Sequence, residues 1–574
     1  MSLILLGNEA LAQGAKDAGV KVVSSYPGTP STEITETIAA LGGVYAEWAA
    51  NEKVAAEVAM GAAVGGARAM CCMKHVGLNV ASEVLFTGAY TGINGGLVFV
   101  VADDPGMHSS QNEQDTRFYA MSAHVPILEP SSAQEAYDFI RLAFEMSESC
   151  DIPVIIRMTT RIAHTRGIVV PREMADAPVK PYVKAPQKYV MMPNNARPRK
   201  YTLMANLKKV LEFAKENGIN RVEKGSDNTG FICAGGVYQY VKEAAPEGSI
   251  YKVGMPYPMQ CDEAKAFADS VADLYVVEEL EPVMELQLNS FGIFPKGQDT
   301  FSKFGEYTAE SVACAIQGEA MAADTITDLP GRPPVLCPGC PHRGAFTAIK
   351  RLKLNAFGDI GCYTLGANPP LSAMDSTVCM GASIGMTHGA ALAQGEEFNK
   401  HAVAVIGDST FFHSGLDGLA SVCYNQSNIT VLVLDNGTTG MTGHQDNPST
   451  GMTLGGNAVA PIAIEDVAKA VGAKNIYIVD PLDLPKMQAT LKEAVEADGV
   501  SVVIARHKCV LIDRSKKPMY EVDQQKCIGC GMCLQSGCPA MRKENGKVNI
   551  DPSMCRGCNL CVHLCPVGAI KGGC

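Results

Sequence analysis

The chain has 574 residues, of which 47% are hydrophobic and 19% charged, with a formal net charge of -12 and a pI near 5.5. This length is too great for one hydrophobic core, so several domains are expected. The acidic balance and the lack of a basic run exclude a nucleic-acid or acidic-membrane surface. The short apolar run at the N-terminus has no basic segment before it, which argues against a signal peptide or membrane span. We expect a soluble, cytoplasmic protein.

Three stretches indicate domain boundaries. Residues 171–200 contain six prolines and no helical or strand period, which predicts an extended connector. The other two are DLPGRPPVL at 328–336 and the charged segment LIDRSKKPMYEVDQQ at 511–525. The predicted domains are 1–190, 200–325, 330–512 and 520–574.

The first three predicted domains alternate β-branched runs with helical patterns. The runs end in Gly, Asp or Asn, and include VKVVSSYPG, GLVFVVADDPG, GFICAGGVY, LYVVEEL, AVAVIGDST, ITVLVLDNG and VSVVIARHK. This pattern is typical of parallel sheets covered by helices on both faces, so the fold class is multidomain α/β. Ligands of such sheets bind beyond the carboxyl ends of the strands, where the polar turns fall.

A helix is predicted in the first domain over EWAANEKVAAEVAMGAAVGGARAM. Val54, Val58 and Ala62 recur every four residues on one face, and Glu52 stands at the helix start beside Asn51. A carboxylate at this position is also what the helix dipole favours in any helix.

Polar residues end two strands of the third domain. Asp408 follows Gly407, and Asn436 lies 28 residues later at the tip of a neighbouring strand. Glycine permits close backbone approach, and the two oxygen ligands converge on one point that suits magnesium and a diphosphate. Two ordinary strand-end turns are the alternative. The pattern resembles the diphosphate motif of thiamine-diphosphate enzymes, with Ser409 and Asp435 as departures.

Thiamine chemistry also needs a carboxylate against the aminopyrimidine ring of the cofactor. Glu52 is the preferred candidate, ahead of Glu57 on the same helix.

Cysteine usage indicates metal rather than disulfides, because a cytoplasm keeps thiols reduced. Eight of the 21 cysteines lie between 527 and 565 in an ordered spacing. The scattered ones are predicted to be small core side chains: Cys71, Cys72, Cys150, Cys233, Cys261, Cys314 and Cys423.

The tail repeats three closely spaced cysteines followed by a Cys-Pro pair, as in two-cluster bacterial ferredoxins, in which the fourth ligand crosses over. The resemblance implies one [4Fe-4S] cluster on Cys527, Cys530, Cys533 and Cys565, and a second on Cys555, Cys558, Cys561 and Cys538. Zinc knuckles are the alternative. Four residues separate Cys533 from Cys538 instead of the usual three, so one is expected to loop out near Gly537.

Long strings along the whole chain resemble the alpha subunits of the indolepyruvate type within the 2-oxoacid:ferredoxin oxidoreductase family. They are SYPGTPSTEI, MKHVGLNVASE, ADDPGMHSSQNEQDTRFYA, CPGCPHRGAF and LDNGTTGMTG. The resemblance implies a pyrimidine-binding domain, a transketolase C-terminal-like domain, a diphosphate-binding domain and the ferredoxin tail. It also implies CoA-dependent oxidative decarboxylation of an aryl-2-oxoacid, such as indolepyruvate, to an acyl-CoA, with carbon dioxide and reduced ferredoxin as the other products.

The same resemblance assigns roles to residues. Asp408, the Asn436 side chain and the backbone oxygen of Thr438 would hold magnesium, and Thr29 would meet the carboxylate of the oxoacid. Pyruvate-specific relatives have an arginine where this chain reads ADDPG, so its replacement is open. Lys74, His75 and Arg117 are candidates, since each can donate to a carboxylate, and structural polar roles are the alternative. A last group consists of polar turn residues suited to a cleft: Asn79, His108, Gln111 and Asn112.

A third, proximal cluster is implied by the match of Cys337, Cys340, Cys362 and Cys509 to the pyruvate relatives. Such a cluster would split the electron pair that decarboxylation releases, because ferredoxins accept single electrons. A zinc site on Cys337, Cys340 and His342 is the rival reading.

Related enzymes carry a gamma-type domain that we do not expect in this chain, so the resemblance implies a separate beta subunit and an alpha2beta2 heterotetramer. Two other functions stay open: a non-redox thiamine decarboxylase or synthase with structural clusters, and a non-catalytic electron-transfer subunit.

Overall fold

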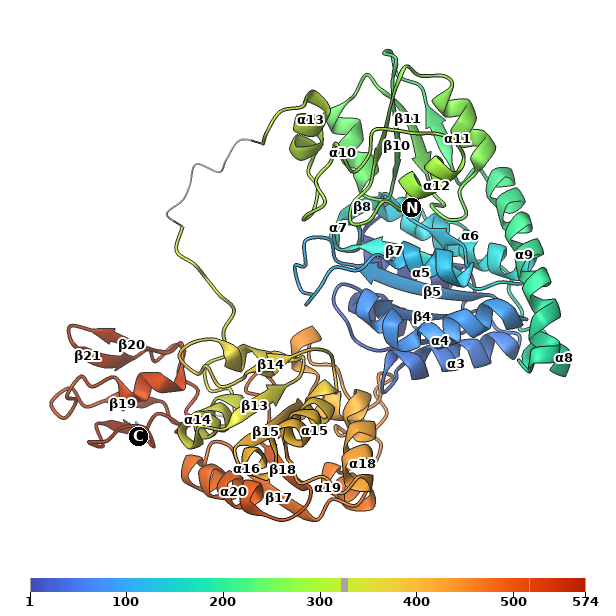
Figure 1. Cartoon of the computed structure of the whole chain (residues 1–574). Coiled ribbons are helices and arrows are strands. Elements are labelled where there is room, and N and C mark those ends of the chain that lie inside the picture. The colour runs from blue at the N-terminus through green and yellow to red at the C-terminus, as the bar shows by residue number, and fades with distance from the viewer. Residues whose placement is uncertain (1, 322–328, 516, 573–574) are drawn as a thin grey trace. The chain divides into compact units, whose positions relative to one another are not determined.

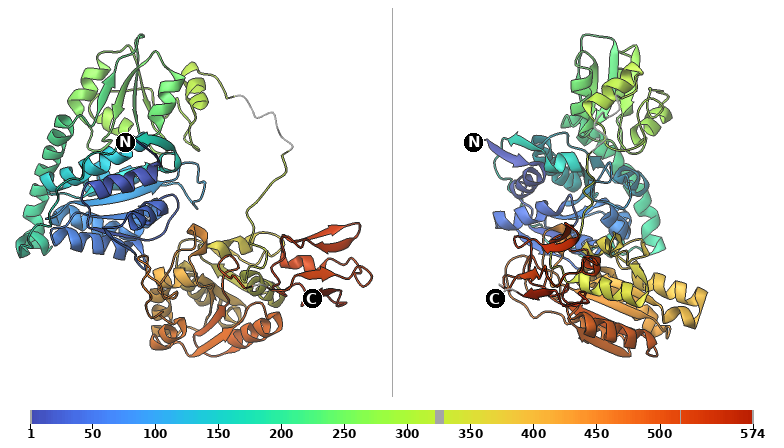
Figure 2. Two further views of the ribbon diagram at one scale, coloured as in Figure 1. Left: turned by 180° about the vertical axis from the view of Figure 1, so that it is seen from behind. Right: turned by 90° about the vertical axis from the view of Figure 1, so that its left-hand side faces the viewer.

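The computed structural model describes residues 2–321, 329–515 and 517–572. The chain forms two compact units, residues 1–327 and 328–574, each built from sheets and helices (Figures 1 and 2). The expected boundary at 328–336 begins at a residue outside the described ones. The predicted second domain, 200–325, also ends outside them. All seven β-branched runs contain a strand, so the predicted α/β fold class is confirmed.

The first unit contains a six-stranded parallel sheet in the order β3-β2-β4-β5-β7-β6. Its strands are β2 (Val22–Ser25), β3 (Tyr45–Trp48), β4 (Ala69–Lys74), β5 (Leu97–Asp103), β6 (Ile127–Leu128) and β7 (Val154–Thr159). Its helices are α1 (Gly7–Asp17), α2 (Thr32–Leu41), α3 (Glu52–Val64), α4 (His75–Thr91), α5 (Thr116–Ala123), α6 (Ala133–Cys150) and α7 (Thr160–His164). α1 packs on α6, and α3 on α4. Because the strands are parallel, the loops after β2, β3, β4 and β5 leave from the same edge.

A second, four-stranded sheet in this unit has the order β12-β10-β11-β9, with only β9 antiparallel. Its elements are β9 (Arg221–Glu223), β10 (Thr229–Ala234), β11 (Ser249–Val253), β12 (Asp273–Val277), α10 (Val237–Ala244), α11 (Cys261–Ala268), α12 (Val283–Ser290) and α13 (Ala309–Gln317). A small antiparallel pair joins β1 (Leu3–Leu6) to β8 (Arg166–Val169).

The expected extended connector over 171–200 is wrong at its C-terminal end. Helices α8 (Pro186–Tyr189) and α9 (Pro193–Glu216) begin inside it. Pro193 occupies the first turn of α9, where a missing N–H costs nothing. Arg199 donates to the Tyr90 carbonyl oxygen at 2.6 Å and binds Asp151 at 3.1 Å. These tertiary contacts hold the helix start against α4 and outweigh the interior Pro198.

The second unit is built on a parallel sheet in the order β14-β13-β15-β16-β18-β17. Its strands are β13 (Asn355–Gly358), β14 (Ser376–Thr377), β15 (Ala402–Gly407), β16 (Thr430–Asp435), β17 (Asn475–Val479) and β18 (Ser501–Arg506). Its helices include α14 (His342–Leu352), α15 (Ala382–Gln394), α16 (Glu396–Asn399), α17 (Asp408–Thr410), α18 (Leu416–Tyr424), α19 (Ile464–Ala470) and α20 (Leu484–Glu496). A short π-helical segment at Phe411–Gly415 joins α17 to α18, and Phe411 is buried in the core.

The C-terminal part of this unit has two antiparallel pairs, β19–β22 and β20–β21 (Figure 1). Its elements are β19 (Tyr520–Val522), the 3₁₀ helix η4 (Met532–Ser536), β20 (Met541–Glu544), β21 (Lys547–Ile550) and β22 (Ile570–Gly572). One apolar cluster runs from Leu336 and Phe346 in the sheet domain to Leu560 and Ile570 in this part. The two parts therefore share a core.

None of the helices in the described part of the chain is both long enough and apolar enough to cross a membrane.

Candidate active site and cluster sites

Glu52 is the first residue of α3 and is 5% exposed. Asn51 caps the helix, because its side chain accepts a hydrogen bond from the Val54 N–H at 2.9 Å. The Glu52 side chain lies against Gly77 of α4. An added Cβ at Gly77 would stand 2.7 Å from Oε1 of Glu52. The absence of a side chain at residue 77 therefore gives the Glu52 carboxylate its place.

Glu57, the weaker candidate on the same helix, has a different environment. Its side chain is 47% exposed and forms an ion pair with Lys53, one turn earlier. This is the arrangement of a solvated helix face.

Thr29 lies in the loop after β2, and Lys74 is the last residue of the neighbouring strand β4. Lys74 is buried, and its Nζ donates to the Ser109 carbonyl oxygen at 2.7 Å. The Ser109 hydroxyl reaches the Thr29 carbonyl oxygen at 3.5 Å. Burial lowers the pKa of Lys74 to about 8, while Asp104 opposes that shift. The structure thus gathers a buried cation and a threonine around Ser109.

His75 begins α4 and is 2% exposed. Neither ring nitrogen has a hydrogen-bond partner within the described residues. Burial, helped by the charge of Lys74, lowers the pKa of His75, while Asp103 and the backbone groups of Asn112 and Ala102 oppose the shift. A buried ring without partners is an orphaned polar group, and a bound ligand would satisfy it.

The loop from Asp104 to Asp115 is organised by the Asp104 carboxylate. It accepts hydrogen bonds from the Ser109 N–H at 2.8 Å, the Ser110 hydroxyl at 2.5 Å and the Thr160 hydroxyl at 2.7 Å. Burial raises the pKa of Asp104, but these hydrogen bonds outweigh it and hold the value below normal. Asp104 therefore fixes Ser109, which in turn contacts Lys74.

The other polar residues of this region are more exposed. Gln111 and Asn112 are exposed, and the Asn112 side chain accepts from Gln114 at 3.0 Å. His108 pairs with Glu306 at 3.1 Å, and Asn79 accepts from the Tyr119 hydroxyl.

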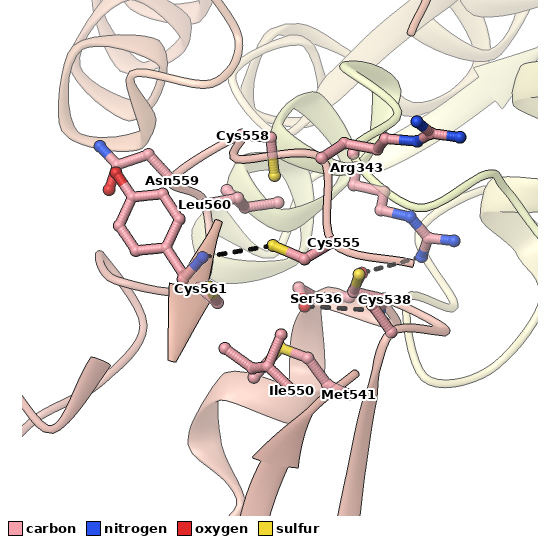
Figure 3. Close-up of a pocket in the computed structure, with 14 residues that line it drawn as sticks. Arg343, Ser536, Cys538, Met541, Ile550, Cys555, Cys558, Asn559, Leu560 and Cys561 are labelled. Carbon is pink, nitrogen blue, oxygen red and sulfur yellow. Dashed lines mark hydrogen bonds between the residues drawn. The ribbon is translucent and has the colours of Figure 1, made fainter. Parts of the chain in front are cut away.

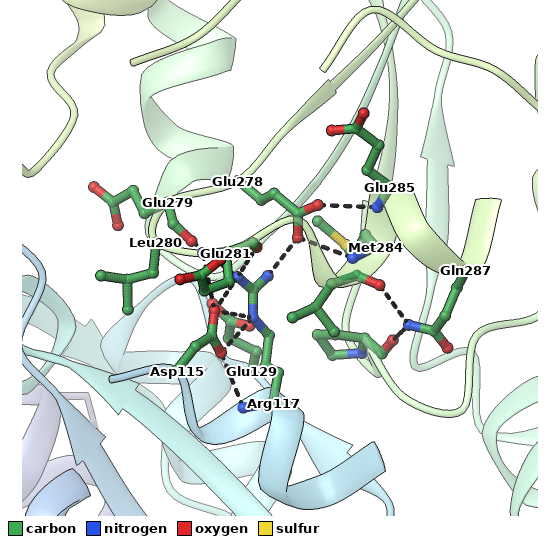
Figure 4. A network of polar contacts seen from close by, with 12 residues as sticks. Asp115, Arg117, Glu129, Glu278, Glu279, Leu280, Glu281, Met284, Glu285 and Gln287 are labelled. Carbon is green, nitrogen blue, oxygen red and sulfur yellow. Dashed lines mark hydrogen bonds and ion pairs between the residues drawn. The ribbon is translucent and has the colours of Figure 1, made fainter. Parts of the chain in front are cut away.

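Arg117 is committed to the interior of the first unit (Figure 4). It is 1% exposed, pairs with Asp115 at 2.6 Å and with Glu278 at 2.7 Å, and donates to the carbonyl oxygens of Glu279 and Glu281. These contacts join α5 to the end of β12 and leave its guanidinium occupied. We therefore assign Arg117 a structural role and do not retain it as a carboxylate ligand.

In the second unit, Asp408 follows β15 and is 3% exposed. Burial, with Asp435 nearby, raises the pKa of Asp408 to about 7. The Asn447 side chain donates to its carboxylate at 3.1 Å. A buried carboxylate with a raised pKa is one that a divalent cation would stabilise in the ionised form, so Asp408 fits a magnesium ligand.

Asn436 follows β16, and its side chain has defined contacts on both sides. Its Nδ2 donates to Nε2 of His342 at 3.3 Å, and its Oδ1 accepts from the Thr438 N–H at 3.2 Å. Burial lowers the pKa of His342 to about 4, so the ring is neutral and can accept. His342 therefore orients the Asn436 amide.

The neighbouring motif residues have local explanations. An added Cβ at Gly407 would lie 2.6 Å from Cε1 of Tyr363, so glycine here admits that ring. Ser409 accepts a hydrogen bond from the Thr439 hydroxyl at 2.9 Å. Asp435, a departure from the motif, pairs with Arg506 at 2.6 Å.

Four residues of these sites were missed by sequence reasoning: Asp104, Ser109, His342 as an orienting group, and Asn447. Asp104 and Ser109 lie in the string ADDPGMHSSQNEQDTRFYA, but the Thr160 and Lys74 partners come from other elements. Asn447 lies in a loop without a strand-end signal.

Cys337, Cys340, Cys362 and Cys509 lie around the Asn436 turn and the start of α14. The Cys509 N–H donates to the Asn436 carbonyl oxygen at 2.9 Å. Sγ of Cys362 and Nδ2 of Asn436 both lie within 4 Å of the place of a Cβ on Gly440. Burial, together with the neighbouring Cys337 and Cys509, raises the pKa of Cys340 to about 12 and that of Cys362 to about 11. A coordinating metal would deprotonate such thiols.

The rival zinc site would take His342 as a ligand, but the Asn436 amide donates to Nε2 of that ring. In a cubane cluster each thiolate binds a different iron, so the four cysteines suit a cluster better than a single ion.

Two cavities in the C-terminal part are each lined by four of the tail cysteines. One is lined by Cys538 together with Cys555, Cys558 and Cys561 (Figure 3). The other is lined by Cys527, Cys530, Cys533 and Cys565. The fourth cysteine of each cavity thus comes from the opposite half of the repeat. Gly537, in the four-residue gap, has a φ of +66°, a conformation that favours glycine.

Comparisons with known proteins agree with this architecture. The family described as "Pyruvate flavodoxin/ferredoxin oxidoreductase, thiamine diP-bdg" matches residues 13–222. The "Thiamine pyrophosphate enzyme, C-terminal TPP binding domain" matches 359–505, and a "4Fe-4S dicluster domain" matches 519–566. The chain therefore has thiamine-diphosphate and iron–sulfur domains.

Curated relatives match over nearly the full length. The indolepyruvate oxidoreductase subunit IorA of Pyrococcus horikoshii is 43% identical over 99% of this chain and 96% of its own, and that of Archaeoglobus fulgidus is 40% identical over 99% and 97%. A solved 2-oxoglutarate:ferredoxin oxidoreductase from Magnetococcus marinus is 19% identical over 55% of this chain and 65% of its own, with a TM-score of 0.47. The extent of the IorA matches shows that the chain is an oxidoreductase subunit and belongs to the indolepyruvate type of the thiamine-diphosphate-dependent 2-oxoacid:ferredoxin oxidoreductase family.

Proposed function

We propose that this chain is the catalytic alpha subunit for CoA-dependent oxidative decarboxylation of aryl-2-oxoacids, with indolepyruvate and related arylpyruvates as substrates. One oxoacid, one CoA and two oxidised ferredoxins would give one aryl-acyl-CoA, one carbon dioxide, two reduced ferredoxins and a proton. The names of the relatives support the indolepyruvate class.

One observation carries the redox assignment. Asn436, a candidate magnesium ligand, accepts a hydrogen bond from the backbone of Cys509, a candidate cluster ligand, at 2.9 Å. A diphosphate site whose turn is bonded to a cysteine of a cluster suits electron transfer from the cofactor. A non-redox thiamine decarboxylase, the alternative, has no need of this proximity.

The diphosphate half of the cofactor site would use the turns after β15 and β16. Asp408, the side chain of Asn436 and the backbone oxygen of Thr438 would hold magnesium, with Gly407 and Ser409 beside the diphosphate. The buried Asp408 carboxylate and the Asn436 amide oriented by His342 support this assignment. When bound, thiamine diphosphate supplies the carbanion sink that decarboxylation needs.

Glu52 would hold a proton against the aminopyrimidine ring, and its burial against Gly77 supports this role. Lys74 and Thr29 would bind the carboxylate of the oxoacid, with His75 as an orphaned donor beside them. Gln111 and Asn112 would contribute from the exposed loop above Ser109.

Three [4Fe-4S] clusters would carry the electrons out. The proximal one would use Cys337, Cys340, Cys362 and Cys509. The first ferredoxin-like one would use Cys527, Cys530, Cys533 and Cys565, and the second Cys555, Cys558, Cys561 and Cys538. The two cysteine-lined cavities support the last two assignments.

The relatives are named as subunits, which supports a partner chain. We propose a separate beta subunit with the gamma-type domain in an alpha2beta2 heterotetramer, with ferredoxin as the electron acceptor. A cytoplasmic location would keep the cluster cysteines reduced.

The decisive experiment is an anaerobic substrate panel of indolepyruvate, phenylpyruvate, hydroxyphenylpyruvate and pyruvate, assayed with CoA and a low-potential dye. Dye reduction and acyl-CoA formation with the arylpyruvates, and little with pyruvate, are expected. Aldehyde release without dye reduction would favour the non-redox decarboxylase.

A further inference from the structure

Arg343 is the second residue of α14 and is 3% exposed. Its Nε donates to the Cys337 carbonyl oxygen at 3.0 Å, and its Nη1 to the Ser536 carbonyl oxygen at 3.0 Å. Its Nη2 donates to the Leu336 carbonyl oxygen. The guanidinium thus joins the Cys337 turn to the helix η4 that precedes Cys538.

Arg343 differs from two other buried arginines, whose positive charges are each neutralised by two carboxylates. Arg117 pairs with Asp115 and Glu278, and Arg157 with Asp103 and Glu129. The hydrogen bonds of Arg343 within the described residues all end on neutral carbonyl oxygens. A buried charge costs several kcal/mol unless an opposite charge compensates it.

The groups near Arg343 that would become negative are cysteines, which bind a cluster as thiolates. It lines the cavity of Cys538, Cys555, Cys558 and Cys561 (Figure 3). Burial lowers the pKa of Arg343, and charges on Cys538, Cys340, Cys337 and Cys558 oppose this. Cys538 and Cys558 belong to the second ferredoxin-like cluster proposed above. Cys337 and Cys340 belong to the proximal one.

We infer that Arg343 is a positioning residue between the proximal cluster and the cluster of Cys538, and that it supplies the buried positive charge next to both. The inference rests on the cluster assignment proposed above. Transfer of one electron between the two clusters, when they are bound, would form and break no bond. A cation stabilises the more negative, reduced form of a cluster, so Arg343 raises both reduction potentials.

The unusual spacing before Cys538 acquires a role in this arrangement. Ser536, whose carbonyl oxygen accepts from Arg343, lies in the four-residue gap. An added Cβ at Gly537 would stand 3.0 Å from Nη1 of Arg343. The longer gap thus presents a carbonyl oxygen to the guanidinium and keeps the adjacent position free of a side chain.

The test compares Arg343→Gln and Arg343→Lys with the wild type in the cluster-loaded full chain. Iron and acid-labile sulfide are measured first, and cluster potentials follow from redox titrations monitored by electron paramagnetic resonance. Arg343→Gln is expected to lower the equilibrium constant for reduction of both clusters about tenfold, which corresponds to about 59 mV for one electron. Arg343→Lys keeps the charge and should recover most of the shift.

Arg556→Gln is the matched control. Arg556 lines the same cavity but is exposed, so water screens its charge and a much smaller shift is expected. Unchanged potentials in an iron-replete Arg343→Gln chain, or an equal shift in Arg556→Gln, would overturn the inference.

If Arg343→Gln loses iron, Gly537→Asn provides the measurement, since asparagine tolerates a positive φ and its side chain crowds the guanidinium without removing it. A lowered potential would support the inference, and an unchanged one would refute it. An iron content of about eight atoms per chain in the wild type would instead show that the proximal cluster does not form. The effect of Arg343 on the Cys538 cluster would still be measurable.

Discussion

The side chain of Glu52 occupies the space that a side chain at residue 77 would need. A Cβ on Gly77 would lie 2.6 Å from Cγ and 2.7 Å from Oε1 of Glu52. The start of α3, which carries Glu52, therefore packs against the first turn of α4, which carries Gly77. The position of the carboxylate depends on a glycine 25 residues away in sequence.

Gly77→Ala should therefore impair activity without unfolding the chain. The new methyl group displaces the Glu52 carboxylate, and a displacement of about 1 Å costs about 100-fold in rate. Alanine favours the helix by about 0.5–1 kcal/mol, so thermal stability should not fall much. Dye reduction with an arylpyruvate and a thermal melt measure the two effects.

Substitution of the two glutamates separates a catalytic role from a surface role. Glu52→Gln should lose about 100- to 10,000-fold in dye reduction, because the proton-holding carboxylate is removed. Glu57→Gln should stay near the wild-type rate, since Glu57 is exposed. Unchanged dye reduction in Glu52→Gln would refute the thiamine mechanism and favour a non-catalytic electron-transfer subunit.

Lys74 predicts a pH dependence of substrate binding. Its pKa of about 8 means that the free chain loses this cation as the pH rises above 8, so KM for the oxoacid should rise about tenfold per pH unit there. Lys74→Arg stays charged and should give a flat profile. A slope that persists in Lys74→Arg would remove Lys74 from the carboxylate site.

Lys74 also affects stability in a defined direction. The folded-state pKa lies below the ordinary lysine value of 10.5, so the unfolded chain binds more protons between pH 8 and 10.5. Stability should rise with pH across this window, and Lys74→Met should remove that contribution. Denaturant melts of both chains at pH 7.5, 9 and 10.5 report the difference.

Substitution of Asp408 should have opposite effects on the stability of the chain without cofactor and of the chain loaded with magnesium and thiamine diphosphate. Asp408→Asn removes a buried carboxylate and should stabilise the free chain by about 1 kcal/mol or more. The same change should abolish the rise in melting temperature that magnesium and thiamine diphosphate together produce in the wild type. Asn447→Ala is the comparison, because Asn447 contacts Asp408 without being a proposed ligand, and it should retain most of the rise.

Iron analysis counts the clusters. The wild type should contain about twelve irons per chain, and Cys362→Ser should lower this to about eight without affecting the two ferredoxin-like clusters. Cys423→Ser is the control, since Cys423 lies beside an apolar core, and it should keep the full content. A wild-type value of about eight would contradict the proximal cluster.

Arg117 should prove structural. Arg117→Ala leaves Asp115 and Glu278 buried without their cation, which typically costs about 3–5 kcal/mol. The KM for the oxoacid in the folded fraction should be unchanged. Denaturant unfolding and steady-state kinetics at a temperature below the transition check both parts, and a raised KM with normal stability would return Arg117 to the substrate site.

Local patterns in the sequence determined the features that depend on neighbours along the chain. The strands follow from β-branched runs, and Asp408 and Asn436 mark strand ends because parallel strands send their carboxyl ends to one edge. Cysteine spacing predicted both tail clusters, since three ligands of each lie within one short turn.

Only the tertiary structure decided the features in which the partners are far apart in the sequence. Burial distinguishes Glu52 from Glu57, and Arg117 finds Glu278 161 residues away. His342 and Asn436 are 94 residues apart, and Arg343 and Ser536 are 193 apart. The spacing of residue types along the chain reflects the local geometry of strands and turns. Whether a buried charge is neutralised depends instead on which groups, distant in the sequence, the fold brings beside it.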